Sequence, residues 1–265
     1  MNRLLAALLL IACIAPARAE TIILASTTSV DGSGLLAAIL PVFTKSTGIE
    51  VKVLAQGTGQ ALATAARGDA DLVLVHDPDA EAEFIAEGHG ILRREIAWND
   101  FIVVGPGGDP AHIAGTKDVL AALKSIYASQ AAFVSRGDKS GTDALEKRLW
   151  KAVGLNPAGQ PWYKDIGGGM GAALNAAAAM DATTISDRGS WIAFNNKRSL
   201  VIQVQGDPSL INRYDVIQLN PQKHGSAKLG PARQLAEWLA APAGQTAIGA
   251  YQLGGEQLFH PDAKP

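Results

Sequence analysis

Apolar and polar positions along this chain follow two periods, which predict strands and helices in turn. Seven short apolar runs rich in β-branched residues predict buried strands. They lie at residues 22–24, 51–54, 72–75, 101–104, 133–134, 201–204 and 216–219. Between them, apolar residues recur every three to four positions, as in an amphipathic helix. This spacing predicts helices at residues 35–43, 60–67, 80–87, 119–127, 142–153, 171–180 and 229–239. Alternating strands and helices favour an α/β fold with parallel sheets.

Two breaks in this pattern divide the chain. Glycine, proline and aspartate fill residues 105–110, directly after a predicted strand, and a second polar break surrounds residues 206–208. We therefore predict a discontinuous first lobe at residues 20–105 and 206–265, and a second lobe at residues 106–205. Two chain crossings would join the lobes, and a ligand would bind in the cleft between them.

The first nineteen residues are typical of an export signal. A positive start at Arg3 precedes an apolar run over residues 4–14, which is too short for a transmembrane helix, and a small-residue cleavage site ends at Ala19. We predict cleavage after Ala19 and a periplasmic product. The competing interpretation is a lipoprotein anchored at Cys13, but the residues after Cys13 lack the polar tether expected after a lipid anchor.

Composition excludes several classes of protein. The 265 residues include 23 Lys and Arg and 25 Asp and Glu, so the formal net charge is −2, which becomes −4 when Arg3 and Arg18 leave with the signal. Because nucleic-acid binders carry a basic stripe, we predict no nucleic-acid partner. The single cysteine excludes an intrachain disulfide framework and a cysteine-rich zinc site, and the histidines lack metal-ligand spacing. We expect no metal cation and no cofactor.

Three loops rich in hydroxyl groups open predicted helices at the carboxyl ends of predicted strands. The first holds Ser26, Thr27, Thr28 and Ser29, although one such residue is enough to cap a helix. In the second loop, glycines on both sides of Thr58 would let main-chain N–H groups face a ligand. In open α/β sheets, ligands bind at this end of the strands.

The third loop adds a charge. Arg136 follows a predicted buried strand, and Ser140, Gly141 and Thr142 then open a helix. Helix N-termini offer free N–H donors and a partial positive charge, and arginine adds a fixed, always charged fork. Together the loops predict a small site made almost wholly of hydrogen-bond donors, as a tetrahedral oxyanion requires. The predicted ligand set is Ser26, Thr27, Thr28, Thr58, Arg136, Ser140, Gly141 and Thr142.

The content and order of these loops resemble one family, the periplasmic tungstate-binding proteins of Tup-type ABC transporters. The family motifs T-T-T-S, G-T-G-Q-A-L, G-D-A-D, S-R-G-D-x-S-G-T and D-R-G-[ST]-W correspond to residues 26–29, 57–62, 68–71, 135–142 and 187–191. Ser26 replaces the first threonine of the first motif. The similarity covers residues 21–250. The R-x-D-x-S-G-T core is also similar to that of phosphate-binding proteins of the same transport class, so it is not specific for tungstate.

The resemblance implies a two-lobed periplasmic binding protein type II fold, in which each lobe is a central sheet flanked by helices. It implies a protein that captures tungstate, or molybdate, and delivers it to the membrane permease and ATPase of an ABC importer, rather than an enzyme. It also implies Arg136 and Thr142 as direct ligands from one lobe, with Thr27, Thr28 and Thr58 from the other. We expect the protein to act as a monomer.

Several acids leave the identity of the anion open. Tungstate and molybdate are fully deprotonated dianions near neutral pH, which suits a site made of donors, whereas phosphate keeps a proton and needs an acceptor. If Asp31 or Asp138 points into the site, it would accept the proton of phosphate, and the site would favour phosphate more strongly. Ser29, Asp187 and Arg188 are further candidate ligands. The last two would equally serve as the N-cap and first turn of a helix.

Two enzyme interpretations are weaker. Residues 167–172 match the dinucleotide pattern G-x-G-x-x-A, but such a site needs a preceding apolar strand, and residues 161–165 do not form one. We therefore expect the glycine-rich segment to be a flexible loop that leads into the alanine-rich helix ending near Met180. A periplasmic phosphate-ester hydrolase would need a nucleophile beside a base that a third group orients, and the chain has no G-x-S-x-G elbow. His76 follows a predicted strand and could line a cleft, but a lone histidine is more often a surface or capping residue, and we expect that role.

Overall fold

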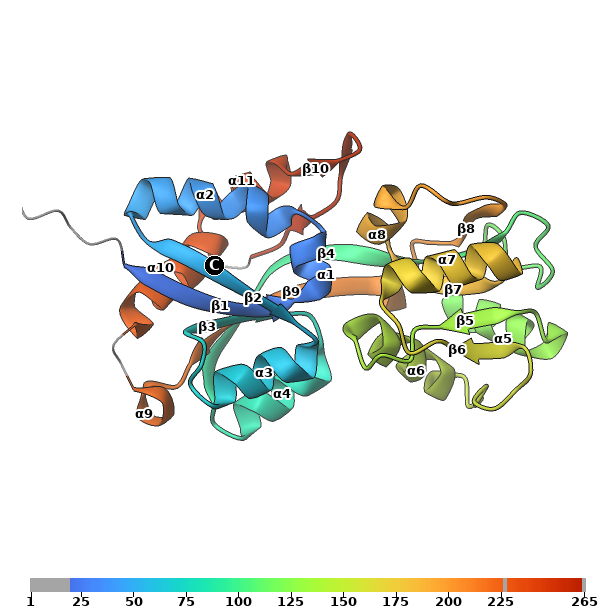
Figure 1. Cartoon of the computed structure of the whole chain (residues 1–265), viewed down its shortest axis with the longest axis horizontal. Coiled ribbons are helices and arrows are strands. Elements are labelled where there is room, and N and C mark those ends of the chain that lie inside the picture. The colour runs from blue at the N-terminus through green and yellow to red at the C-terminus, as the bar shows by residue number, and fades with distance from the viewer. Residues whose placement is uncertain (1–19, 226–227, 264–265) are drawn as a thin grey trace, which may run out of the picture.

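The computed structural model describes residues 20–225 and 228–263 and places their strands and helices in two lobes, arranged end to end (Figure 1). The predicted signal sequence, including Cys13 and the cleavage site after Ala19, lies outside the described residues. Within them, no helix combines the length and the apolar character that a membrane crossing requires.

The sheet of the first lobe has the strand order β2-β1-β3-β9-β4. The strands are β1 (Thr21–Thr27), β2 (Glu50–Gln56), β3 (Leu72–Val75), β4 (Gly90–Pro106) and β9 (Ile211–Leu219), with the short β12 (His260–Pro261) added along β4. The first three are parallel to one another, and β9 runs antiparallel to both β3 and β4. Every residue of β3 is buried, since it lies between β1 and β9.

Helices cover both faces of this sheet. One face carries α2 (Leu35–Thr47), α10 (Leu229–Ala240) and α11 (Pro242–Ala250), and the other carries α3 (Thr58–Ala66) and α4 (Pro78–Ala86). Successive residues of a strand point to opposite faces, so Leu24 joins the first hydrophobic layer and Ala25 the second. Short elements complete the lobe: α1 (Thr28–Gly32), α9 (Pro221–His224), β10 (Gln252–Leu253) and β11 (Glu256–Gln257).

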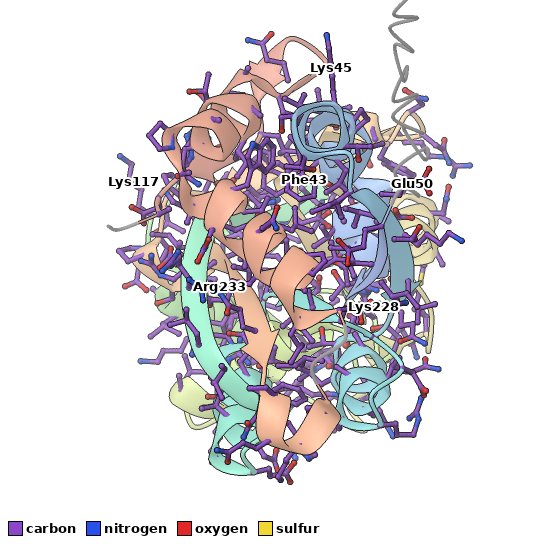
Figure 2. All side chains as sticks on the ribbon, turned by 90° about the vertical axis from the view of Figure 1, so that its left-hand side faces the viewer. Phe43, Lys45, Glu50, Lys117, Lys228 and Arg233 are labelled. Carbon is purple, nitrogen blue, oxygen red and sulfur yellow. The ribbon has the colours of Figure 1, made fainter. Side chains whose placement is uncertain are left out.

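Helix α2 shows how the sequence pattern becomes a packing face. Phe43, on the inner side of α2, is fully buried and packs against Trp238 of α10, with ring centroids 5.5 Å apart. Lys45, two positions further on, points outward (Figure 2). Gly48 ends the helix in the left-handed region, at a φ of 77°, and its N–H donates to the Thr44 carbonyl. The three-to-four spacing of apolar residues therefore marks the buried side of this helix.

The second lobe repeats this layered plan on a smaller sheet. Its strands are β5 (Phe133–Ser135), β6 (Tyr163–Asp165), β7 (Thr183–Asp187), β8 (Leu200–Val204) and the end of β4. β5 lies between β6 and β7 and is parallel to both. Its helices are α5 (Val119–Ser129) and α6 (Gly141–Ala152) on one face, and α7 (Met170–Met180) and α8 (Arg188–Ala193) on the other.

Two segments carry the chain between the lobes (Figure 1). β4 runs without interruption from the first sheet into the second: Ala97 packs in the core of the first lobe and Phe101 in that of the second. The chain returns through β8, the 3₁₀ turn η1 (Pro208–Leu210) and β9. Where the two segments run side by side, Asn99 pairs with Asn212, whose Nδ2 donates to Asn99 Oδ1 at 2.9 Å.

The strands and helices predicted from hydrophobic periodicity are all present. That prediction omitted the short helices α1 and α9, the helix α11 and the two-residue strands β10, β11 and β12, together with two strands of the second lobe, β6 and β7. Residues 163–165 were not expected to form an apolar strand, but Tyr163–Asp165 does form β6, an edge strand that needs no continuous apolar run. Residues 166–169 after it form neither helix nor strand and lead into α7, as expected. β7 is fully buried although its sequence is polar. Thr184 shows why this is tolerated: its hydroxyl donates to the Val134 carbonyl at 2.8 Å, so the buried polar group is satisfied.

Candidate functional site

A cavity of about 440 Å³ lies between the two lobes. From the first lobe it is lined by Thr28 and Ser29 at the start of α1, and from the second lobe by Arg136, which follows β5. The N-termini of α7 and α8 complete the wall, at Gly169 and Ser190. The hydroxyl loop after β1 and the arginine after β5 thus face the same space.

Arg136 is held rigidly within its own loop. The residue is buried, with only 6% of its surface exposed. Its Nη1 donates to Thr142 Oγ1 at 3.2 Å, and its Nη2 donates to Asp138 Oδ2 at 2.5 Å. Among the described residues, its buried Nε has no hydrogen-bond partner. The fork is oriented by its neighbours, and its Nε–H is left for a ligand.

Asp138 forms its hydrogen bonds within this loop and does not line the cavity. Besides accepting from Arg136, it accepts from the backbone N–H of Ser140 at 3.1 Å. Burial alone raises the pKa of Asp138, but hydrogen bonds from Ser140 and Arg136, with the arginine charge, bring its pKa below the usual value. Asp138 is therefore an ionised acceptor already engaged by donors. Asp31 is exposed and lines a different groove, formed by α2 and β2.

The hydroxyl groups after β1 divide into two kinds. Ser26 Oγ donates to the Leu74 carbonyl at 2.8 Å, so its proton is used within the sheet. Thr27 is the N-cap of α1, and its Oγ1 accepts from Val30 N–H at 3.2 Å. Thr28 is exposed and Ser29 half-buried, and both line the cavity. The two residues at the start of α1 are thus better placed for a ligand than Ser26.

The helices that begin without a side-chain cap include α3 and α7. The N-cap of α3 is Gly57, and the hydrogen bonds within the helix start at Ala61 N–H. Thr58 is buried at this terminus, and its Oγ1 has no partner among the described residues. The N-cap of α7 is Gly169, so the first N–H groups of α7 are equally uncapped. Uncapped N-termini are sites where anions bind.

The register of the first sheet relates Thr58 to the α1 loop. In the parallel ladder of β1 and β2, Thr27 pairs with Gln56, so α1 and α3 begin at the same edge of the sheet. Across the cleft, Gly141 at the start of α6 approaches His76: a Cβ on this glycine would lie 2.6 Å from Cε1 of the ring. The first turn of α6, with Thr142, therefore meets the same edge.

Asp187 and Arg188 adopt the capping arrangement. Asp187 is the N-cap of α8 and accepts from Ser190 N–H at 2.8 Å. Arg188 forms two hydrogen bonds to the carboxylate of Asp100, at 2.7 and 2.6 Å, and a third to Gln205. The guanidinium of Arg188 is thereby held at β4. The Oδ1 atom of Asp187 is buried and has no partner among the described residues.

His76 is the principal residue for which sequence reasoning preferred the wrong alternative. The expectation of a surface or capping residue is wrong, since 5% of its surface is exposed and its Nε2 lies 3.2 Å from Thr27 Oγ1 and 3.1 Å from Ser29 Oγ. Its Nδ1 lies 3.0 Å from Asn212 Oδ1. A base with an orienting third group, which the sequence did not reveal, is therefore present. The available signal was its position directly after a fully buried strand.

The chemistry of this site is that of an anion receptor. It combines one guanidinium, hydroxyl groups and uncapped N–H donors, and the negative charge of Asp138 is compensated by Arg136. Within the described ranges, no group of three His, Cys, Asp or Glu side chains is arranged to hold a metal cation.

Comparison with known proteins agrees with this picture. A family model described as a PBP superfamily domain matches residues 15–243. The tungstate-binding protein TupA of Peptoclostridium acidaminophilum is 44% identical over 247 residues, which cover 92% of this chain and 86% of that protein.

Two solved structures are similar throughout. The tungstate binding protein TupA from Desulfovibrio alaskensis G20 matches with a TM-score of 0.85 and 42% identity, over 93% of this chain and 100% of that one. The tungstate ABC transporter structure from Geobacter sulfurreducens matches with a TM-score of 0.79 and 42% identity, over 88% and 99%. The predicted α/β binding-protein fold and the family resemblance are confirmed: this chain belongs to the PBP superfamily and, within it, to the TupA family of binding proteins.

Proposed function

We propose that this protein captures tungstate and delivers it to an ABC importer as its binding component. The observation that carries the proposal is a pair of buried donors, Arg136 Nε after β5 and Thr58 Oγ1 after β2, that have no partner among the described residues. Leaving a buried donor unpaired costs about 1–3 kcal/mol, and more when it is charged. An oxyanion bound in the cleft would satisfy both donors and so favour the arrangement in which the lobes meet.

The positions of Asp138 and Asp31 favour an anion without a proton. Asp138 is ionised and occupied by Arg136 and Ser140, and Asp31 faces another groove. Neither is placed to accept a proton from hydrogen phosphate. Tungstate and molybdate are fully deprotonated dianions at neutral pH and need only donors. The similar proteins named for tungstate support the same assignment.

The ligand set of this proposal comes from both lobes. Thr28, Ser29 and Thr58 would donate from the first lobe, and Arg136 with Thr142 from the second. Backbone N–H groups at the uncapped starts of α3 and α7 would add donors. Thr27 would contribute by holding α1 in place. Ser26, Ser140 and Gly141 are expected to shape the loops, and Asp187 and Arg188 to hold α8 and β4.

The lobe boundaries predicted at residues 105–106 and 205–206 stay a prediction, and we propose crossings a few residues away. On β4 the core changes between Ala97 and Phe101, and on the return it changes between Leu210 and Tyr214. Asn99 lies within the first interval, and Asn212, with which it pairs, lies within the second. Bending at these two strands would open and close the cleft.

The cellular setting is part of the same proposal. A binding component of an ABC importer works outside the cytoplasmic membrane, passing its ligand to a permease that an ATPase drives. The predicted export signal fits a periplasmic location, and a monomer with one cleft suffices for delivery. The protein would bind its anion without transforming it.

Phosphate, or another protonated oxyanion, is the second candidate ligand. Asp187 favours it, because its buried Oδ1 has no partner among the described residues and would accept a proton from such an anion. Glycine and serine of the first turn of α8, beside this carboxylate, line the cavity. Phosphate therefore belongs in any test of specificity.

Titration calorimetry of the purified protein against tungstate, molybdate, sulfate and phosphate tests the proposal. We expect tight binding of tungstate, with a stoichiometry of one, and much weaker binding of sulfate and phosphate. Failure to bind tungstate would refute the assignment. Tight phosphate binding that Asp187→Asn removes would establish the second candidate instead.

A further inference from the structure

We infer that His76 is a positioning residue of the oxyanion site, which fixes the directions of the hydroxyl protons of Thr27 and Ser29. The inference rests on the proposed function and concerns a side chain outside the ligand set. His76 follows β3 and lies under the start of α1. It contacts the hydroxyl groups on one side and the crossing strand β9 on the other.

The protonation of the ring follows from the groups around Asn212. Asn212 Nδ2 donates both of its hydrogens, to Asn99 Oδ1 at 2.9 Å and to the Tyr214 hydroxyl at 2.6 Å. The oxygen of the same amide therefore faces His76 Nδ1, 3.0 Å away. An amide oxygen only accepts, so Nδ1 must carry the hydrogen.

The second ring nitrogen is consequently an acceptor. Burial lowers the pKa of His76, and the charge of Arg136 acts in the same direction, whereas the hydrogen bond to Asn212 and the charges of Asp187 and Asp77 raise it. Burial dominates, so the ring is neutral at neutral pH. With its hydrogen on Nδ1, a neutral imidazole presents a lone pair at Nε2.

The lone pair at Nε2 accepts a hydrogen bond from one hydroxyl group, and this determines which of two neighbouring hydroxyl groups remains a donor for the anion. Thr27 Oγ1 and Ser29 Oγ both lie within 3.2 Å of Nε2, and they are 3.0 Å from each other. Thr27 is buried and Ser29 lines the cavity with Arg136. When Thr27 donates to Nε2, its own oxygen stays free to accept from Val30 N–H. Ser29 then keeps its proton for the anion.

His76 also ties this donor to the rest of the cleft. The ring packs against Gly141 of the second lobe, and through Asn212 it is bonded to the pair of strands that cross between the lobes. The hydroxyl of Ser29 is thus oriented relative to the loop that carries Arg136. A donor fixed in advance loses little freedom when the anion binds, which favours affinity.

The same geometry has a competing interpretation. A serine beside a histidine that an amide orients is also the arrangement of a nucleophile, a base and an orienting group. In that case Ser29 would attack an ester, and His76 would take its proton. The positioning role predicts no turnover, so a chromogenic ester assay separates the two.

A double-mutant cycle on tungstate affinity tests the inference. His76→Phe keeps a ring but has no acceptor, and we expect about ten- to hundredfold weaker binding, the range for one hydrogen bond to a charged group. His76→Gln restores an acceptor and is expected to recover most of the affinity. In a Ser29→Ala background, His76→Phe should cost at most about threefold, because the donor that it orients is absent. His224→Gln, in α9, is the matched control and should bind as the unmodified protein does.

Two readouts keep the test independent of folding and of the proposed function. Nitrogen NMR of the imidazoles in the unmodified protein should show His76 with its hydrogen on Nδ1, and any other state would overturn the inference. Equal losses from His76→Phe in both backgrounds would also overturn it, as would ester turnover that Ser29→Ala abolishes. If the unmodified protein does not bind tungstate, the proposed function fails, whereas the NMR result still reports on the ring.

Discussion

Gly141 packs against the ring of His76 so closely that an added Cβ would lie 2.6 Å from Cε1 and 3.0 Å from Nδ1. The two residues belong to different lobes: Gly141 begins α6, and His76 follows β3. Because a carbon at these distances must displace the ring, the absence of a side chain at position 141 is what lets α6 approach the first lobe.

Gly141→Ala should therefore weaken ligand binding. An extra methyl in a well-packed contact costs about 1–3 kcal/mol, which corresponds to roughly five- to hundredfold in affinity for tungstate. The melting temperature of the ligand-free protein should change little, because alanine is a better helix former than glycine. Calorimetry measures the first quantity and thermal unfolding the second.

Gly230→Ala is the matched control for this substitution. Gly230 lies in the first turn of α10, and nothing approaches within 4 Å of the added Cβ. We expect unchanged affinity. If both variants bind tungstate equally well, the contact between Gly141 and His76 has no part in ligand capture.

Substitutions of Arg136 should separate its charge from its geometry. Arg136→Ala removes the buried cation beside Asp138, and we expect a loss of about 2–5 kcal/mol, or roughly thirtyfold to several thousandfold in affinity. Arg136→Lys keeps the charge but cannot reach Thr142 and Asp138 while also presenting a third donor. Calorimetry should therefore rank lysine between arginine and alanine, and equal binding by all three would exclude this residue as a ligand.

The sequence predicted those parts of the molecule that depend on local pattern. The apolar spacing of residues 35–43 was enough to identify α2, because one face of that helix packs in the core. The loops after β1 and β5 were recognised because hydroxyl groups and arginine stood where parallel strands end. By contrast, β7 was missed because its sequence is polar, which predicts exposure. Its residues are buried all the same, and a hydrogen bond within the sheet satisfies the hydroxyl of Thr184.

The role of His76 could be recognised only in the folded structure. Its partners Thr27, Ser29 and Asn212 are 47 to 136 positions away in the chain, and only the register of β1, β3 and β9 brings them together. Pairwise spacing in sequence carries no information on such a contact. In the sequence, the glycines at residues 167–169 stood out only as part of a weak dinucleotide pattern, and the cavity shows that α7 presents its N-terminus there, at Gly169.

The stability of the second lobe should depend on pH through Glu146. Burial raises the pKa of this carboxyl from 4.5 to about 7, although the Tyr163 hydroxyl, which donates to Oε1 at 2.6 Å, acts in the opposite direction. The folded protein therefore holds this proton more tightly than the unfolded chain. The stabilisation is complete below about pH 4.5 and is lost as the pH rises through about 7.

Glu146→Gln should remove this part of the pH dependence. Glutamine still offers an oxygen to Tyr163 and Trp150 but never ionises. Between about pH 5 and 8 we expect the free energy of unfolding of the unmodified protein to fall by about 1–3 kcal/mol more than that of the variant. Denaturant titrations at each pH measure it, with the exposed Glu237→Gln as control. Parallel curves for the unmodified protein and Glu146→Gln would contradict the assignment.

A second contact between the lobes lies two helical turns beyond Gly141. Arg148 of α6 extends Nη1 to Asp77 Oδ1 at 3.3 Å and to Asp79 Oδ2 at 3.5 Å, at the start of α4. The arginine side chain is 39% exposed, so solvent screens these ion pairs. Such pairs contribute roughly 0.2–1 kcal/mol each. They would favour the closed cleft without determining what binds in it.

Arg148→Ala should therefore weaken tungstate binding by only about two- to fivefold, and mainly at low salt. Arg233→Ala is the control, because the ion pair of Arg233 with Glu237 lies within α10 and does not join the two lobes. Affinities of both variants and the unmodified protein, measured at two salt concentrations, decide the matter. A salt-independent loss would place Arg148 in ligand contact. No loss at low salt would mean that closure depends on Gly141 and the oxyanion alone.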